Sequence, residues 1–422
     1  MSDLLSQPLK LPCGATLSNR LAKAPLTEGL ADEHNRANEK LVRLYRRWSE
    51  GGAGLLVSGN VQVDRRYLER PGNVAIDNNG GLEWIKAYAK AGTSAGNHFW
   101  MQINHPGRQG AVTRDGTFPA PSAISLKVPG RPPFVPRVMP ETEILDVIRR
   151  FGFVAATARE CGFTGVQIHS AHGYLLSSFL SGLSNTRTDA WGGRLANRAR
   201  ALLETVRAVR EAVGPDFPVG VKLNSSDFQK GGFTNEECLD VVRWLGEERI
   251  DLLEITGGTY EGVPWLEDVK PSTRRREGYF IDYARQIQSV ATTPLMITGG
   301  MRTRAGMEDA LRGGMDMIGL GRPMCVDTDI CKRLLAGETE VAASYESGLP
   351  LDAKQIAVDA TEAEAKALEV WSQLVWFFVQ LWRIGEGQEP KPELSALEAY
   401  RIYCETEQRQ TEKLAALESP LD

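Results

Sequence analysis

Short apolar runs alternate with amphipathic stretches along most of the chain. Eight of these runs have the length of buried strands, and they lie near Leu21, Leu55, Phe99, Val166, Val219, Leu252, Leu295 and Met317. Between the runs, apolar residues recur at helical spacing, and glycines mark several helix ends. Alternation of strands with helices predicts an α/β fold, and eight such units predict a closed (β/α)8 TIM barrel.

Helices are expected between consecutive strands. The predicted ranges are 38–50, 81–96, 141–161, 234–246 and 280–289, and a further helix follows the strand near Val166. The 234–246 helix should begin with a capping box formed by Thr234 and Glu237. Residues 111–140 are rich in proline and glycine, which predicts a long loop that covers the active-site face.

The pattern changes in the last part of the chain. Residues 353–418 are rich in Ala, Glu and Leu and predict two or more helices. One of them carries an apolar stripe made of Trp371, Leu374, Val375, Phe378, Leu381 and Trp382. We interpret the stripe as a face that packs on the outer helices of the barrel, with a subunit interface as the alternative. The chain therefore divides into a barrel, residues 1–340, and a C-terminal helical extension, residues 341–422.

Composition narrows the choice of partners and compartment. The 422 residues carry 49 Lys and Arg against 54 Asp and Glu, a net charge of −5, so no basic bias suggests a nucleic acid partner. The six cysteines are scattered without a CxxC pair, which disfavours a disulfide framework and favours a reducing cytoplasm. No secretory signal is visible, and the most apolar run, 374–381, is too short to span a bilayer.

Three hydrogen-bonding side chains follow the strand at 165–168, namely His169, His172 and Tyr174. The carboxyl ends of barrel strands are where TIM barrels place their chemistry. Two imidazoles three residues apart can converge on one oxygen atom and so make a conjugated C=C bond accept hydride, while the Tyr174 phenol can deliver a proton to the other carbon. Two satisfied histidines with a packing tyrosine remain the alternative, and zinc is disfavoured because HxxH has no third ligand nearby.

The sequence around these residues, HSAHGYLLSSFLSGLSNTRTDAWGGRLANRAR, closely resembles the corresponding segment of the Old Yellow Enzyme family of FMN-dependent ene-reductases. The resemblance extends from about Leu17 to Asp329. It implies a TIM barrel that carries FMN, and it implies that NADPH or NADH reduces this FMN. It also implies that His169 and His172 grip the substrate and that Tyr174 is the proton donor.

The resemblance further implies which residues contact the flavin ring. Ala24, Pro25, Leu26 and Thr27 would lie against it, with the Thr27 hydroxyl bonding the isoalloxazine carbonyl next to N5. Gln102, in QINHPGR, would bond the pyrimidine edge, whereas His105 and Arg108 in the same motif are given structural and functional interpretations of similar weight. Lys222 stands where many relatives carry Arg and would face N1 and the C2 carbonyl as a point charge; an exposed lysine is the alternative.

Glycines supply the remaining cofactor contacts. Gly59 leaves room for a flat ring to approach the backbone. Gly299, Gly300 and Gly321 follow the last two strands, where backbone N–H groups can reach a phosphate, and Arg322 adds a cation. In the resembled family these loops hold the FMN phosphate.

Together these features predict an FMN-dependent NAD(P)H oxidoreductase that reduces activated C=C bonds of α,β-unsaturated carbonyl or nitro compounds. Tyr260, on a loop after the sixth strand, could also reach the substrate. Neither a cysteine cluster nor a GxGxxG motif follows Asp329, so we expect FMN as the only bound cofactor and no metal. The alternatives are a flavin-free, phosphate-binding lyase or isomerase and a scaffold that docks partners through its Trp-rich tail.

Overall fold

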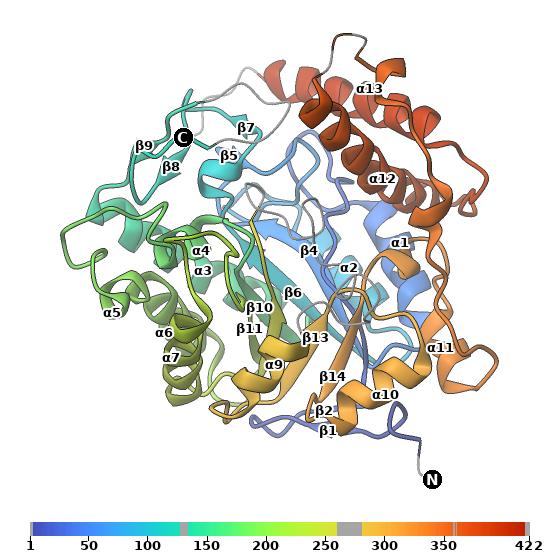
Figure 1. Ribbon diagram of the computed structural model, residues 1–422, viewed down its shortest axis with the longest axis horizontal. Helices are drawn as coiled ribbons and strands as arrows, with labels where there is room; N and C mark the ends of the chain where they lie inside the picture. Colours follow the sequence, from blue (N-terminus) through green and yellow to red (C-terminus); the bar gives the residue numbers. More distant parts are fainter. Residues whose placement is uncertain (1–2, 127–133, 260–280, 358, 360, 418–422) are drawn as a thin grey trace.

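Eight parallel strands close into a barrel at the centre of the molecule (Figure 1). The computed structural model describes residues 3–126, 134–259, 281–357, 359 and 361–417. Around the barrel the strands follow chain order, and all eight neighbouring pairs are parallel. The strands are β3 (Leu21–Lys23), β4 (Leu55–Gln62), β6 (His98–Asn104), β10 (Gly165–Ser170), β11 (Val219–Asn224), β12 (Leu252–Thr256), β13 (Leu295–Thr298) and β14 (Met317–Leu320). The predicted TIM barrel is confirmed.

Helices connect the strands and cover the outside of the barrel. They are α1 (Glu39–Glu50), α2 (Leu82–Gly92), α3 (Glu141–Glu160), α4 (Leu175–Leu180), α5 (Leu195–Arg198), α6 (Arg200–Val213), α7 (Asn235–Glu247), α9 (Ile281–Gln288), α10 (Arg304–Arg312) and α11 (Ile330–Leu335). The predicted capping box is present at the start of α7, where Thr234 and Glu237 each bond the other's backbone N–H. The predicted 81–96 helix ends earlier, at Gly92, and the short helix α4 was not predicted.

The lower half of the barrel interior is apolar. Trp100 of β6 fills it, and glycines on β10 and β11 make room for its ring: a Cβ on Gly165 or Gly220 would come within 2.5 or 2.9 Å of the indole. The antiparallel hairpin of β1 (Leu9–Lys10) and β2 (Thr16–Leu17) packs its leucines into the same cluster. This end of the barrel is therefore closed, and the open mouth lies at the carboxyl ends of the strands.

The predicted 111–140 loop contributes no strand to the barrel. Its described residues form two short pairings outside it. Strand β7 (Val112–Thr113) pairs with β5 (Tyr67–Leu68), and β8 (Pro119–Ala120) pairs with β9 (Arg137–Val138). Residues 127–133 lie outside the described part of the chain.

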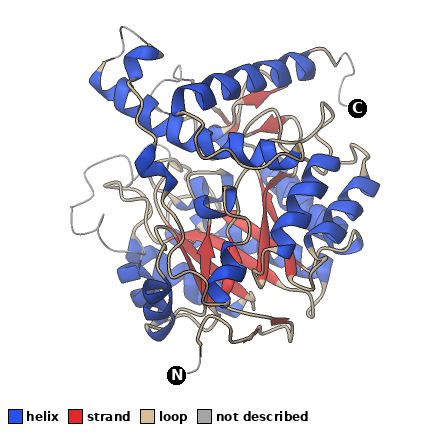
Figure 2. Ribbon diagram, turned by 90° about the vertical axis from the view of Figure 1, so that its right-hand side faces the viewer, coloured by secondary structure: helices blue, strands red, loops and turns tan. Residues whose placement is uncertain are grey.

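Two long helices follow the barrel, α12 (Glu362–Gly385) and α13 (Ala396–Ala415). They pack on each other, and α12 packs on α1, so the pair covers one flank of the barrel (Figure 1, Figure 2). Val375, Leu381 and Trp382 of the stripe are buried. The rings of Trp371, Phe378 and Trp382 lie against Tyr403 of α13, so the aromatic part of the stripe packs within the extension, and packing of the stripe on an outer barrel helix stays a prediction. Over the ranges that the structure describes, no helix is long and apolar enough to cross a membrane.

Candidate functional site

A layer of polar side chains lies inside the barrel above the apolar half. Gln102 donates to Gln167 (2.8 Å), Gln167 donates to Glu254 (2.8 Å), and Lys222 Nζ donates to the other oxygen of Glu254 (2.8 Å). The four residues come from consecutive strands, β6, β10, β11 and β12, and Gln102 with Gln167 and Lys222 with Glu254 are register partners. The layer links these strands by hydrogen bonds just below the mouth.

Lys222 lies within this layer rather than at the surface. Its side chain is 6% exposed and the side chain of Glu254 is not exposed at all. The alternative of an exposed Lys222 is therefore wrong. Sequence reasoning missed Glu254 and Gln167, although a signal was present: each is a polar residue at the centre of an apolar strand, where a barrel directs alternate side chains inward.

His169, His172 and Tyr174 come together at the end of β10, as predicted. The His169 ring centroid lies 5.3 Å from that of His172 and 4.9 Å from that of Tyr174, both edge-to-face. The backbone N–H of Ala171 donates to His169 Nδ1 (3.2 Å), so a neutral His169 carries its hydrogen on Nε2. Among the residues that the structure describes, no three His, Cys, Asp or Glu side chains are placed to hold a metal ion.

Residues on the next two strands hold His172 in place. Its backbone has φ +61, a conformation that L side chains rarely adopt, and its N–H donates to Asn224 Oδ1 (3.1 Å). Its Nε2 lies 3.0 Å from Thr256 Oγ1. Asn224 and Thr256 are the last residues of β11 and β12. The position of the His172 ring therefore depends on strands far away in sequence, and Thr256 is a further residue that sequence reasoning missed.

Both imidazoles are neutral. Burial lowers the pKa of His169 and of His172 well below the usual 6.5, and the Lys222 cation lowers both further. Each ring consequently has one N–H donor and one acceptor nitrogen. A pair of neutral N–H donors can hold an electron-rich oxygen without any change of protonation.

The segment Ala24–Thr27 lies between β14 and β4 at the mouth. The Ala24 N–H donates to the Leu320 carbonyl (2.8 Å), and the Leu26 side chain lies 3.6 Å from where a Cβ on Gly321 would stand. The Thr27 hydroxyl donates to Asn60 Oδ1 (3.1 Å). The structure thus brings together the segment, the end of β4 and the start of the Gly321 loop, as the predicted ring site requires.

Glycine is required at position 59 for another reason than the predicted one. A Cβ on Gly59 would overlap the carboxylate of Glu28, and the Gly59 N–H donates to that carboxylate (2.7 Å). Tyr45 and Tyr88 also donate to Glu28, Tyr88 at 3.3 Å. These bonds therefore hold Glu28, the residue directly after Thr27, in place. Sequence reasoning missed Glu28. A contact between Gly59 and a flavin stays a prediction.

The loops after β13 and β14 have the features of a phosphate cradle. Gly299 and Gly300 have φ +129 and +75, which favour glycine, and the Cβ direction of Gly321 meets only the Leu26 side chain within 4 Å. Arg322 and Arg302 both pair with Glu346, at 3.1 and 2.8 Å, so two cations share one carboxylate. The two arginines and Glu346 together carry a net charge of +1. This charge lies beside the backbone N–H groups of the glycine loops.

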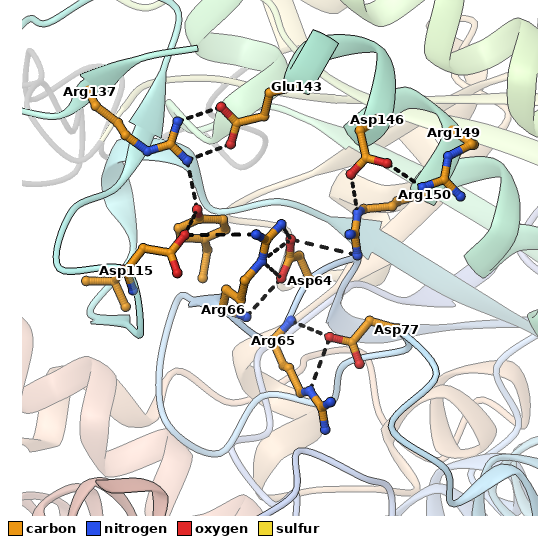
Figure 3. A network of polar contacts seen from close by, with 12 residues as sticks. Asp64, Arg65, Arg66, Asp77, Asp115, Arg137, Glu143, Asp146, Arg149 and Arg150 are labelled. Atoms are coloured by element: carbon orange, nitrogen blue, oxygen red, sulfur yellow. Dashed lines mark hydrogen bonds and ion pairs between the residues drawn. The ribbon is translucent and has the colours of Figure 1, made fainter. Parts of the chain in front are cut away.

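A network of ion pairs connects segments of the rim on the other side of the mouth (Figure 3). Asp64, in the loop after β4, pairs with Arg66 (2.6 Å) and lies 3.8 Å from Arg150 of α3. Arg137 of β9 pairs with Glu143 of α3 (2.5 Å). These pairs join the β4–β5 loop and the 111–140 segment to one helix.

His105 and Arg108 are both buried beneath this rim. His105 Nδ1 accepts from the Gly107 N–H (3.0 Å), its ring lies 5.4 Å from that of Tyr67, and burial lowers its pKa to about 4. Arg108 lies 3.4 Å from the carbonyls of Ile124 and Ser125. These contacts give both residues a structural role. Tyr260 lies outside the described residues.

The mouth fits a flavin that carries a phosphate. The Gly299, Gly300 and Gly321 backbones with Arg322 suit the phosphate, and the polar layer at Gln102 and Lys222 suits the polar edge of the ring. In addition, the Thr298 hydroxyl oxygen is buried without a hydrogen-bond partner among the described residues. Buried groups of this kind require a polar partner.

Comparison with known proteins agrees with this fit. Residues 4–340 match the NADH:flavin oxidoreductase / NADH oxidase family. The chain belongs to this family. Flavin and a reduced nicotinamide nucleotide are therefore its cofactors, and it is a flavin-dependent oxidoreductase, which disfavours the flavin-free alternative.

Two relatives are similar to most of this chain. The chain is 36% identical over 364 residues to the NADH-dependent flavin oxidoreductase iliE of Hypocrea jecorina, covering 78% of this chain and 88% of that protein. It is 35% identical over 404 residues to the protein of the same name from Neonectria sp., covering 86% of this chain. The chain spans about half, 52%, of the length of the Neonectria relative.

Solved structures confirm the fold. The Old Yellow Enzyme homologue from Zymomonas mobilis superposes with a TM-score of 0.69 at 24% identity, covering 86% of this chain and 98% of that one. A 2-naphthoyl-CoA reductase superposes with a TM-score of 0.74 at 26% identity, covering 81% of this chain and 54% of that one.

Proposed function

We propose that this family member reduces the activated C=C bond of α,β-unsaturated carbonyl or nitro compounds. The observation that carries the proposal is the pair of buried, neutral histidines with Tyr174 beside them at the barrel mouth. Relatives named for NADH, such as the NADH-dependent flavin oxidoreductase nadA of Aspergillus parasiticus, support NADH as the reductant. We therefore also propose NADH as the preferred reductant.

In this proposal the chain's residues bind, orient and supply a proton. His169 Nε2–H and the free nitrogen of His172 donate to the carbonyl or nitro oxygen of the substrate and so draw electron density from its C=C bond. Tyr174 holds the proton that the α-carbon receives. Ala24–Thr27, Gly59, Gln102, Lys222, Gly299, Gly300, Gly321 and Arg322 would hold the flavin, which supplies the hydride when bound.

Thr256 sets the tautomer of His172 in this arrangement. For His172 to donate to the substrate from Nδ1, its Nε2 must accept a hydrogen bond, and the Thr256 hydroxyl lies 3.0 Å away to donate it. Thr256→Val should therefore weaken binding of a phenol, which mimics the substrate oxygen, by about tenfold, the effect of losing roughly 1.4 kcal/mol. The measurement is titration of the phenol charge-transfer band, with Thr256→Ser as the matched control. Equal phenol affinity in Thr256→Val and wild type would refute the tautomer argument.

The central experiment follows the visible spectrum of the purified protein without air. A flavin spectrum should bleach on addition of NADH and return on addition of cyclohexenone. Tyr174→Phe should keep the bleaching rate and slow the return by about 10²–10⁴-fold, the usual contribution of a positioned general acid. A return rate equal to wild type would eliminate Tyr174 as the proton donor. A bleached protein that no enone or nitroalkene reoxidises would eliminate the proposed reaction.

The domain division is likewise a proposal. The family match ends at residue 340, which supports a barrel of residues 1–340 and a helical extension of residues 341–422. A subunit interface formed by the extension and a cytoplasmic location remain predictions.

A further inference from the structure

The barrel strands place one cation and one anion inside the barrel. Lys23, Lys222 and Glu254 are the Lys, Arg, Asp and Glu residues that the eight described strands contain. Lys23 faces outward, because its Nζ lies 4.4 Å from the centre of the Trp48 ring on α1. Lys222 and Glu254 face inward and form the ion pair of the polar layer (2.8 Å). The positive charge below the mouth thus has a built-in counter-charge.

Both oxygens of the Glu254 carboxylate are held in place. Lys222 donates to one, and Gln167 Nε2 donates to the other (2.8 Å). Gln167 is held in turn by Gln102, whose Nε2 donates to Gln167 Oε1 (2.8 Å). The side chain of Glu254 is not exposed and that of Lys222 is 6% exposed, so bulk water neither replaces these bonds nor screens the two charges. The carboxylate consequently stays beside the ammonium.

The Lys222 ammonium keeps donors for a ligand. An ammonium has three N–H donors, and among the described residues the bond to Glu254 is the one hydrogen bond of this group. The same cation lowers the pKa of His169 and of His172, so its field extends to the substrate side of the mouth. A group that binds in the mouth therefore interacts with Lys222 and Glu254 as a pair.

We propose that Glu254 is a positioning residue that lowers the reduction potential of the bound flavin by offsetting the charge of Lys222. The inference rests on the proposed function, in which Lys222 holds the flavin. Near neutral pH the reduced ring carries a negative charge at N1, whereas the oxidised ring is neutral. A cation close to the ring favours the reduced form, and a carboxylate bonded to that cation cancels part of the effect.

The lower potential assists the second half of the proposed reaction. It makes the transfer of hydride to the C=C bond of the substrate more favourable, and it makes the uptake of hydride from NADH less favourable by the same amount. NADH supplies both electrons and the hydride hydrogen, so no other reductant is required. Glu254 exchanges neither a proton nor an electron and acts only through Lys222.

Glu254→Gln tests the offset, because it removes the charge and keeps an oxygen that can accept from Lys222. The flavin-loaded variant is equilibrated without air against a redox dye of known potential. The ratio of reduced to oxidised flavin should rise about tenfold, or about 30 mV for a two-electron couple. Lys222→Met should lower the ratio about tenfold, because the cation is lost. An unchanged or lower ratio in Glu254→Gln would overturn the proposal.

Asp251 provides the matched control at the other end of the same strand. It directly precedes β12 at the closed end of the barrel, and its buried carboxylate pairs with Arg210 (2.7 Å). Asp251→Asn should therefore destabilise the fold and leave the flavin ratio at the wild-type value. An equal rise in Asp251→Asn and Glu254→Gln would show that the ratio follows lost stability instead of the charge beside Lys222, and would also overturn the proposal.

If Glu254→Gln does not fold, the double variant Lys222→Met/Glu254→Gln replaces it, because this variant has no unpaired charge in the polar layer. Its flavin ratio should lie within about threefold of wild type. A ratio equal to that of Lys222→Met alone would refute the role of Glu254. The measurement contains no substrate. Reduced protein that no enone or nitroalkene reoxidises would therefore contradict the proposed function, whereas an unshifted ratio in Glu254→Gln would contradict only this inference.

Discussion

Trp382 connects the C-terminal helices to the segment at the barrel mouth, so its replacement should weaken both. The indole is 7% exposed, its Nε1 donates to the Glu28 carbonyl (2.7 Å), and its ring stacks on Tyr403 at a centroid distance of 5.9 Å. Trp382→Phe leaves that buried carbonyl without a partner, at a cost of about 1–3 kcal/mol. The smaller ring leaves a gap of about 40 Å³, which costs about 1 kcal/mol more. We expect the free energy of unfolding to fall by about 2–4 kcal/mol.

Trp371 provides the matched control on the same helix. Trp371 is partly exposed, and its ring meets that of Tyr403 edge-on at a centroid distance of 5.9 Å. Among the described residues, its indole makes no hydrogen bond. Trp371→Phe should therefore cost less than about 1 kcal/mol. The assay is urea unfolding of the holoenzyme followed by far-ultraviolet circular dichroism, at one fixed flavin concentration because bound ligand adds stability. Equal losses in the two variants would refute the reasoning that the bond to Glu28 stabilises the fold.

Two further predictions concern buried charge. Glu254→Gln should lower the free energy of unfolding by about 3–5 kcal/mol, since it leaves the Lys222 ammonium buried without a counter-charge. Adding Lys222→Met should recover most of this loss. A loss below about 1 kcal/mol in Glu254→Gln alone would contradict the argument. Acid should also destabilise the fold, because burial lowers the pKa of His105 to about 4 and the pKa values of His169 and His172 well below 6.5. Only the unfolded chain binds protons just below pH 6.5, so stability present above that pH is lost as the pH falls toward 4, by about 2 kcal/mol at pH 5 for His105 alone. A urea midpoint that does not change between pH 7 and pH 5 would refute this.

Most of the fold could be predicted because its signals are local. Each barrel strand is a short apolar run, and the α7 capping box lies within four residues of sequence. Helix α4 could not be predicted in this way, because all six of its residues are buried and no polar face reveals a helical period. Strand β4 continues past a bulge between Val57 and Asn60 to Gln62, and the apolar run near Leu55 does not by itself predict this length.

The candidate site was predictable where its members are neighbours in sequence. His169, His172 and Tyr174 follow one strand, so their spacing alone brought them together. Glu254 and Asn60 bond to partners far away in sequence: Lys222 lies 32 positions from Glu254, and Thr27 lies 33 positions from Asn60. A pattern in one sequence does not reveal which distant side chains pair, so these roles required the structure.

The contacts of the C-terminal helices also set an order of events during synthesis. Trp382 lies 354 positions after Glu28, to which it donates. Gln410 lies 381 positions after Gly29 and donates to the Gly29 carbonyl. At a translation rate of roughly 5–20 residues per second, the 24–29 segment leaves the ribosome roughly 20–70 seconds before these partners do. The Glu28 and Gly29 carbonyls obtain these partners only when α12 and α13 dock. We therefore expect the mouth of the barrel to reach its final form at that step.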